Sequence, residues 1–181
     1  AVVIIGFGMN GVLPFRLGEV AKLAYAQQLF GIAPPRLIAA TAAEKLMDLC
    51  ALLLIGLGIV ALNLLAPFNV AQAANAVMQT QDDGGAIINI GSVSAIDPQP
   101  GTAAYSAAKA GLLVLTKALA LEWAPKVRIN HITTGLIRTE AAAEVYGADG
   151  GAAVTRTIPM ERMAVPADIA NSCLFLASPL S

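Results

Sequence analysis

The chain has 181 residues, of which 57% are hydrophobic and only 13% are charged, and its formal net charge is −1. A near-neutral chain of this kind has no strongly basic surface, so nucleic acid is excluded as an expected partner. Cys50 and Cys173 are far apart in apolar segments, so we expect buried, reduced thiols and not a disulfide framework. The N-terminus lacks a charged region and a cleavage site, so no signal peptide is expected, and no metal site is predicted.

The first residues spell a glycine-rich turn. The apolar run Ala1–Ile5 is followed by Gly6, Gly8 and Gly11 in the pattern G-x-G-x-x-G. A dinucleotide-binding turn of that spelling leads through a helix to a second strand that ends in an acidic residue. Here the sequence continues as VLPFRLGE and reaches the pair Pro34-Pro35. We therefore predict that this turn does not bind phosphate.

A long apolar helix is expected from about Arg36. Residues 46–66 carry a single charge, Asp48, and are numerous enough to span a bilayer, which takes roughly 20 residues. Arg36, Lys45 and Asp48 all lie towards its N-terminal side, which would face the cytoplasm if the helix crosses a membrane. The alternative is a buried core helix, since an aspartate is costly in lipid. Membrane association through residues 46–66 is the interpretation we favour.

The remainder of the chain alternates between helical and extended patterns. We expect helices over Asn63–Gln79, Ala103–Ala124 and Pro166–Ala177, and strands over Ala86–Ser92 and Val127–Gly135. This order predicts parallel strands joined by crossover helices, and hence an α/β fold. Three large side chains are expected to pack in its core: Phe68, Met78 and Trp123.

The stretch SVSAIDPQPGTAAYSAAK, residues 92–109, carries the strongest chemical signal. Tyr105 and Lys109 are four residues apart on a helix, so their side chains share one face. A tyrosine hydroxyl normally has a pKa of about 10, and a nearby ammonium group lowers it by favouring the phenolate. Tyr105 is thus a candidate general acid or base. Ser92 ends the preceding strand, where its hydroxyl could bind a substrate oxygen.

With these motifs in place, residues 63–181 resemble the C-terminal two thirds of a short-chain dehydrogenase/reductase. The stretches NLLAPF, GGAIINIGSVSA, AAYSAAKAGLLVLTKALALEWA, VRINHITTGLIRT and IPMERMAVPADIANSCLFLAS follow the family's order and spacing. The resemblance implies part of a Rossmann-type, doubly wound parallel sheet. It also implies hydride transfer between NAD or NADP and a carbonyl or alcohol substrate.

The same resemblance assigns four catalytic roles. Tyr105 matches the acid/base, and Lys109 matches the lysine that lowers the tyrosine pKa and holds the nicotinamide ribose, so both would also contact the cofactor. Ser92 matches the serine that polarises the substrate carbonyl, whereas Ser94 fits the spacing less well. Asn63 matches the asparagine that holds a water molecule in the proton relay.

Two further residues are matched to the cofactor, and one residue departs from the pattern. The backbone around Ile137 would meet the nicotinamide carboxamide, and Thr139 would contact the cofactor. Thr134 stands before Gly135 where the family usually has proline, which fixes φ, so we expect a looser turn there. His131 is expected to be a core or surface residue, because the family needs no histidine for catalysis.

Residues 1–62 resemble a different family, the membrane region of lysylphosphatidylglycerol synthase/flippase-like proteins. Its N-x-x-L-P-x-R-x-G-E and E-[RK]-L-x-D motifs are matched by Asn10, Leu13, Pro14, Arg16, Gly18 and Glu19, and by Glu44, Lys45, Leu46 and Asp48. We therefore expect two parts, a helical membrane-like segment over 1–62 and a partial dehydrogenase domain over 63–181. Neither the family's pyrophosphate-binding turn nor its last strand is recognised in the sequence, so weak NAD(P) binding is expected.

Three functions follow from these resemblances. The first is an oxidoreductase acting on a small carbonyl or alcohol substrate, with a cytoplasmic dehydrogenase part. Members of the family it resembles are usually oligomers, and the sequence leaves open whether this chain forms a homo-oligomer. The second is a fragment of a flippase-like integral membrane protein. The third is a fused or truncated chain that keeps recognisable sites without activity. The sequence leaves open the substrate and the choice between NAD and NADP, because the strand that discriminates between them is not recognised.

Overall fold

The computed structural model describes residues 27–28, 31, 33–140 and 151–181. The opening G-x-G-x-x-G and the first membrane-family motif lie outside this range. The chain divides into two compact units, Ala1–Ile55 and Gly56–Ser181, which are described separately.

Helix α3, Pro34–Val60, accounts for most of the described part of the first unit. It begins at Pro34, two residues before the predicted start, because proline is tolerated in the first turn of a helix, where its missing N–H has no partner to lose. Its large apolar side chains are exposed, including those of Leu46, Met47, Leu49, Leu52, Leu53, Leu54 and Ile55. Cys50 is exposed as well, and Cys173 is partly exposed. The prediction of buried thiols is therefore wrong, although both cysteines are free.

Two described helical runs are long and apolar enough to cross a membrane. They are Ile38–Met78, whose most apolar window has no buried residues, and Ala103–Trp123, whose window is 28% buried. Length and composition alone are a weak indication of a membrane span, because the core helix of a soluble protein passes the same test. The difference in burial separates the two runs.

The second unit contains two strands and the helices that cover them. After the last residues of α3, the chain forms the π-helix η2 (Ala61–Leu65), α4 (Ala66–Met78), β1 (Gly85–Ile90), the 3-10 turn η3 (Val93–Ala95), α5 (Ala103–Trp123), β2 (Val127–Ile132), α7 (Ala152–Thr155) and α8 (Pro166–Ala177). The predicted elements are all present. Both strands end earlier than predicted, since the chain turns into η3 after β1 and into an irregular segment after β2.

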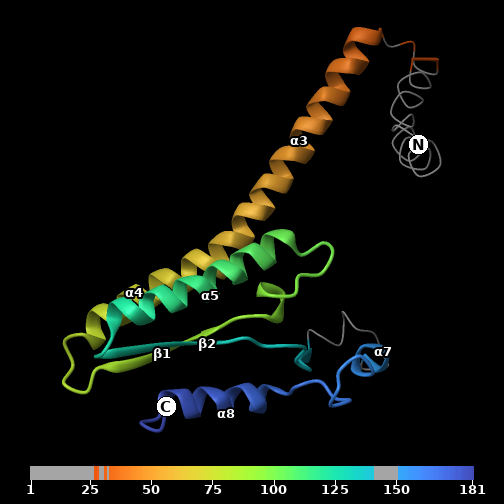
Figure 1. The fold of residues 1–181 in the computed structure, drawn as a ribbon. Helices are drawn as coiled ribbons and strands as arrows, with labels where there is room; N and C mark the ends of the chain where they lie inside the picture. The colour runs from red at the N-terminus through yellow and green to blue at the C-terminus, as the bar shows by residue number, and fades with distance from the viewer. Residues whose placement is uncertain (1–26, 29–30, 32, 141–150) are drawn as a thin grey trace. The chain divides into compact units, whose positions relative to one another are not determined.

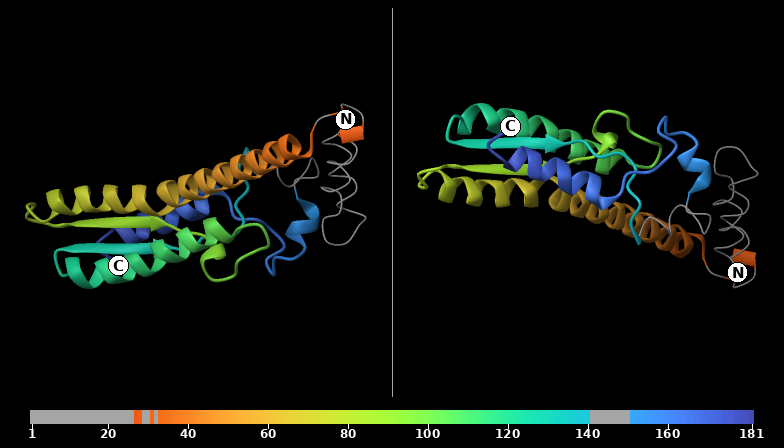
Figure 2. Two further views of the ribbon diagram at one scale, coloured as in Figure 1. Left: turned by 90° about the horizontal axis from the view of Figure 1, so that it is seen from above. Right: turned by 90° about the horizontal axis from the view of Figure 1, so that it is seen from below.

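Strands β1 and β2 are parallel, in a register that runs from Gly85 opposite Val127 to Ile90 opposite Ile132. Helix α5 is the crossover between them, as the predicted α/β order requires. Helices α4 and α5 lie side by side on one face of the strand pair, and α8 covers the other (Figure 1). Viewed from below, α8 crosses in front of the two strands (Figure 2). The three layers bring the carboxyl ends of both strands to one end of the unit.

The core of this unit lies between the strands and the helices α4 and α5. Its buried residues are Ala71, Leu119, Trp123, Val127 and Ile129, and Phe68, Met78, Ile87, Leu115 and Ala120 pack against them. The predicted packing roles of Phe68, Met78 and Trp123 are confirmed. This apolar contact is the main force that holds α5, and the residues it carries, against the sheet.

Two polar ties fix the layers further. On one face, the buried Asn89 donates from Nδ2 to Thr116 Oγ1 at 2.9 Å, and Thr116 donates in turn to Leu112 O at 2.7 Å. On the other face, Arg128 of β2 donates to Leu176 O at 3.0 Å and to Ser178 O at 3.1 Å, so it satisfies carbonyls at the end of α8. The sheet is thereby tied to a helix on each side.

Candidate functional site

Ser92 lies just beyond the carboxyl end of β1 and caps η3. Its Oγ accepts a hydrogen bond from the Ser94 backbone N–H at 3.2 Å. Because the oxygen already accepts this bond, the hydroxyl proton is available to donate to another oxygen. Ser94 lies inside the 3-10 turn, and its backbone supports the Ser92 side chain.

Tyr105 and Lys109 lie in the first two turns of α5, one turn apart on the same face. Lys109 Nζ donates to the carbonyl oxygen of Ile90, the last residue of β1, at 3.1 Å. The same Nζ lies 5.7 Å from the centroid of the Tyr105 ring. The ammonium group is therefore held between the strand end that precedes Ser92 and the tyrosine.

Asn63 lies in η2, and its Nδ2 donates to Ile59 O at 3.0 Å, one turn back along the helix. The neighbouring Leu64 packs against Gly111 of α5, where an added Cβ would lie 3.2 Å from Leu64 Cδ2. The Asn63 segment thus contacts α5 two residues beyond Lys109. The structure therefore places the Asn63 segment against α5, which bears Tyr105 and Lys109. The Asn63 side-chain N–H itself donates within its own helix.

Ile137 and Thr139 lie on the segment that follows β2. Ile137 forms an isolated parallel bridge with Ala164, supported by Arg138 N donating to Ala164 O at 2.8 Å and Ala164 N donating to Leu136 O at 3.0 Å. Thr139 is exposed at the end of this segment. The bridge fixes the segment against the chain that leads into α8.

His131 lies on β2, directly opposite Asn89 of β1. Its ring covers Gly91, where an added Cβ would collide with ring atoms Cε1 and Nε2, so a side chain at this position would displace the ring. Burial, and then the positive charges of Lys109 and Lys117, hold the pKa of His131 below its ordinary 6.5. Nε2 is buried and has no hydrogen-bond partner among the described residues. The residue is partly buried, and its ring is nearer the candidate site than the expected core or surface position indicated.

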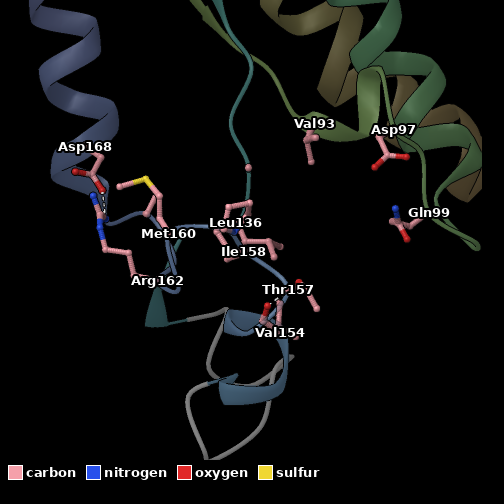
Figure 3. Close-up of a pocket in the computed structure, with 13 residues that line it drawn as sticks. Val93, Asp97, Gln99, Leu136, Val154, Thr157, Ile158, Met160, Arg162 and Asp168 are labelled. Atoms are coloured by element: carbon pink, nitrogen blue, oxygen red, sulfur yellow. Dashed lines mark hydrogen bonds and ion pairs between the residues drawn. The ribbon is translucent and has the colours of Figure 1, made fainter.

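A cavity of about 1070 Å³ opens beside these residues. Val93, Leu136, Val154, Ile158 and Met160 give it apolar walls, and Asp97, Gln99, Arg162 and Asp168 give it polar edges. Figure 3 shows Asp97 and Gln99 on one side and Arg162 and Asp168 on the other. None of Ser92, Tyr105 and Lys109 lines the cavity itself, but Val93 follows Ser92 and Leu136 precedes Ile137.

The ion pair at the edge of the cavity also caps α8. Asp168 Oδ2 accepts from Arg162 Nη1 at 2.9 Å and from Val165 N at 3.0 Å. The Arg162 hydrogen bond, followed by that from Val165, holds the pKa of the Asp168 carboxyl below its ordinary range. Arg162 is therefore engaged by the residue that caps α8.

Three supporting residues, Asn89, Thr116 and Gly91, were missed from the sequence, and a fourth, Thr134, was interpreted there only as a departure from proline. Asn89, Thr116 and Thr134 are buried polar residues, and Gly91 is the position that the His131 ring covers. An asparagine within the apolar strand AIINI and a threonine in the apolar helix were the available signals. A buried polar residue in such a run usually has a specific partner.

Comparison with known proteins supplies the family. A family model described as enoyl-(acyl carrier protein) reductase matches residues 57–181, which is more than half of the chain. The chain belongs to the short-chain dehydrogenase/reductase family. A second model, the lysylphosphatidylglycerol synthase transmembrane region, matches residues 1–88. Both predicted resemblances are confirmed, and the two matches overlap over residues 57–88.

Individual short-chain dehydrogenase/reductases give the same result. An uncharacterised short-chain type dehydrogenase/reductase of Sinorhizobium fredii is 41% identical over 126 residues, which is 68% of this chain and 49% of that protein. The crystal structure of 3-hydroxyacyl-CoA dehydrogenase type-2 from Mycobacterium avium matches with a TM-score of 0.64 and 28% identity, over 68% of this chain and 50% of that one. The NADP-bound structure of ElxO matches with a TM-score of 0.58 and 30% identity, over 65% of this chain and 48% of that one.

These matches confirm the predicted Rossmann-type fold for the dehydrogenase part. The chain spans about half the length of the curated relatives it matches, as the 49% coverage of the Sinorhizobium protein illustrates. The matched half contains the strand end and the crossover helix that carry the candidate catalytic residues.

Proposed function

We propose that this chain carries the catalytic half of an NAD(P)-dependent oxidoreductase that interconverts a carbonyl and an alcohol. The observation that carries the proposal is the Lys109 ammonium, bonded to Ile90 O at the end of β1 and held 5.7 Å from the Tyr105 ring. This contact joins the helix that bears Tyr105 to the strand that leads into Ser92. Family membership of residues 57–181 supports the same reaction class.

Each residue has a defined task in the proposed reaction. The Ser92 hydroxyl donates to the substrate carbonyl oxygen, because its own oxygen is already occupied by the Ser94 N–H. In carbonyl reduction Tyr105 gives its phenolic proton to that oxygen, and in alcohol oxidation it takes the proton back. The Lys109 charge stabilises the phenolate left behind. The Asn63 segment, packed against α5, would hold the water that returns the proton.

The nicotinamide end of the cofactor fits the donors present. The ammonium of Lys109, the hydroxyls of Tyr105 and Thr139, and the backbone at Ile137 match ribose hydroxyls and a carboxamide in hydrogen-bonding chemistry. Bound NAD(P) supplies or accepts the hydride. We also propose that binding is weak, because residues 1–62 match a membrane family where a dehydrogenase would have its pyrophosphate-binding turn.

The substrate is proposed to occupy the cavity beside Ser92. Its walls are largely apolar, and its polar groups stand at the edges. A carbonyl compound with an apolar body fits this lining. The reacting carbonyl would reach Ser92 past Val93.

Turnover with matched variants tests the catalytic proposal. Purified chain is supplied with millimolar NADH or NADPH and a panel of ketones, and alcohol formation is measured. Tyr105→Phe and Ser92→Ala should lower turnover at least about a hundredfold, while Ser94→Ala retains it. Lys109→Met should lower it strongly, whereas Lys117→Met, on the same helix, should not. Unchanged turnover in Tyr105→Phe, or no turnover by the wild-type chain, contradicts the proposal.

Cofactor affinity is a separate test. Titration of the chain with NADPH, followed by nicotinamide fluorescence, should give at most weak binding. A submicromolar dissociation constant would show that the chain holds the pyrophosphate after all.

We further propose that residues 1–62 associate with a membrane through positions 46–66, and that residues 63–181 carry the reaction. The exposed leucines of α3 and the match to a transmembrane region support this division. A single crossing with the N-terminal side in the cytoplasm would put residues 67–181 on the far side, away from cellular NAD(P), so we propose membrane association without a topology. Replacing Leu52, Leu53 and Leu54 together by Ser should move the chain to the soluble fraction and retain turnover. A chain that is soluble without the substitutions contradicts it.

A further inference from the structure

Thr134 occupies an unusual position relative to Ser92. It lies two residues beyond β2, in the TTG stretch where the short-chain family usually has a proline, and its side chain is 8% exposed. From the sequence this threonine was expected to loosen the turn. The structure instead gives it two hydrogen bonds to the segment that holds Ser92.

The two bonds reach the residues on either side of the serine. Thr134 Oγ1 donates to the carbonyl oxygen of Gly91 at 2.8 Å, and the backbone N–H of Val93 donates to Thr134 O at 2.7 Å. Gly91 N also donates to Ile132 O at 2.8 Å, so hydrogen bonding between the two strand segments continues beyond Ile90 and Ile132, the last pair of the sheet. Ser92 is thus held between two neighbours that are each bonded to Thr134.

The hydroxyl is the part of Thr134 that a proline or valine could not replace. Any residue at this position offers a backbone carbonyl to Val93, but only a side-chain donor can bond to Gly91 O from here. Because the site is buried, water does not readily take the place of a missing donor, and the Gly91 carbonyl would lose its bond from this side. The His131 ring lies against Gly91 on the same stretch of backbone.

We propose that Thr134 is a positioning residue for Ser92: its hydroxyl and carbonyl clamp Gly91 and Val93, and this fixes the direction of the Ser92 hydroxyl. The inference rests on the proposed function for its catalytic consequence, but the clamp itself does not depend on turnover. Thr134 acts through the backbone on both sides of the serine.

Amide hydrogen exchange tests the clamp directly. In the wild-type chain the Val93 amide should be protected to a degree comparable with central amides of β1. Thr134→Val keeps the shape and removes the donor, and it should speed exchange at Val93 by about fivefold or more relative to a central strand amide. Thr134→Ser keeps the donor and should restore protection. Thr116→Val removes another buried hydroxyl that donates to a carbonyl at 2.7 Å, and it should leave that ratio unchanged.

Kinetics test the consequence for Ser92. With a ketone that the wild-type chain reduces, Thr134→Val should lower kcat about tenfold with little change in KM, because a misdirected serine fails mainly in the transition state. Thr134→Ser should recover kcat. If the wild-type chain reduces no ketone, the proposed function fails, and the exchange ratio still decides the clamp. Fast exchange at Val93 in the wild type, or an unchanged exchange ratio in a folded Thr134→Val chain, overturns the inference.

Discussion

Helices α3 and α5 look alike in the sequence and differ in their surroundings. Both are long and apolar enough to cross a membrane. In α5, Leu112 is 1% exposed and Thr116 is 3% exposed, whereas in α3 Leu54 is 71% exposed. A hydropathy profile therefore indicates how much apolar surface a helix has available for burial. Whether it is a core helix depends on the elements that pack against it.

Polar residues separate the two helices in the same way. Thr116 of α5 has a buried donor in Asn89 and an acceptor in Leu112 O. In α3, Lys45 Nζ lies 3.7 Å from Glu44 Oε1 and 3.5 Å from Asp48 Oδ2, and these ion pairs lie at the helix surface. The Asn89–Thr116 hydrogen bond fixes α5 to the sheet, whereas the Lys45 ion pairs join residues of α3 to one another.

The largest expected difference is the cost of removing a leucine. Leu112→Ala should lower the free energy of unfolding by about 2–5 kcal/mol, because it leaves a cavity in a packed core. The matched change Leu53→Ala, at an exposed position of α3, should cost less than about 0.5 kcal/mol in detergent solution. Chemical unfolding followed by the fluorescence of Trp123, the single tryptophan, measures both. Equal effects would remove the distinction between the helices.

A buried hydroxyl should come next. Thr116→Val leaves the Asn89 amide without its acceptor and should cost about 1–3 kcal/mol in the same unfolding measurement. Thr41→Val in α3 should cost less than about 0.5 kcal/mol. Adding Asn89→Leu to Thr116→Val should recover part of the loss, because both ends of the polar contact are then apolar. A double variant no better than the single one would contradict the proposed tie.

The lysines of α5 should influence the sheet through His131. The pKa of His131 is lowered by burial and then by Lys109 and Lys117, so either Lys→Met change should raise it, while Lys126→Met should not. His131 is the single histidine, so one set of imidazole NMR signals reports the titration. Because the folded-state pKa is the lower one, stability is lost as the pH falls from about 6.5 through the folded value. A measured His131 pKa above 6.5 would be a shift in the opposite direction and would contradict this prediction.

The smallest effect belongs to the ion pairs of α3. Asp48→Asn should change the free energy of unfolding by about 1 kcal/mol or less, because both side chains are exposed and the pair is screened by salt. Measurements at low and high salt should converge. A salt-independent loss above about 2 kcal/mol would mean that Asp48 is buried against a partner, as the membrane-family resemblance implies.

The predictable part of this structure was the part that periodicity and spacing encode. The order of helices and parallel strands, the placement of Tyr105 and Lys109 on one face, and Ser92 at a strand end all followed from local patterns. The strand ends were less predictable, because the turn into η3 depends on the Ser92 side chain and on the hydrogen bond from Val93 to Thr134.

The unpredicted part consists of contacts between residues far apart in the chain. Lys109 bonds to Ile90 across 19 positions and Thr134 to Gly91 across 43. A single sequence records each residue but not its partner. Thr134 was therefore interpreted only as a residue that lacks the proline ring, and not as a hydrogen-bond donor. Its hydroxyl becomes informative when the two strand ends are seen together.

The π-helix η2 has a consequence for how two unrelated sequences can share one helix. Hydrogen bonds from i to i+5 accommodate one residue more than an α-helical turn, so the side chains that follow are rotated by about 100° relative to an uninterrupted α-helix. The five residues of η2 lie within the overlap of the two family matches, residues 57–88. Such a turn lets an apolar helix with one angular phase continue, through Pro67 in the first turn of α4, into an amphipathic helix with another, without a loop at the seam.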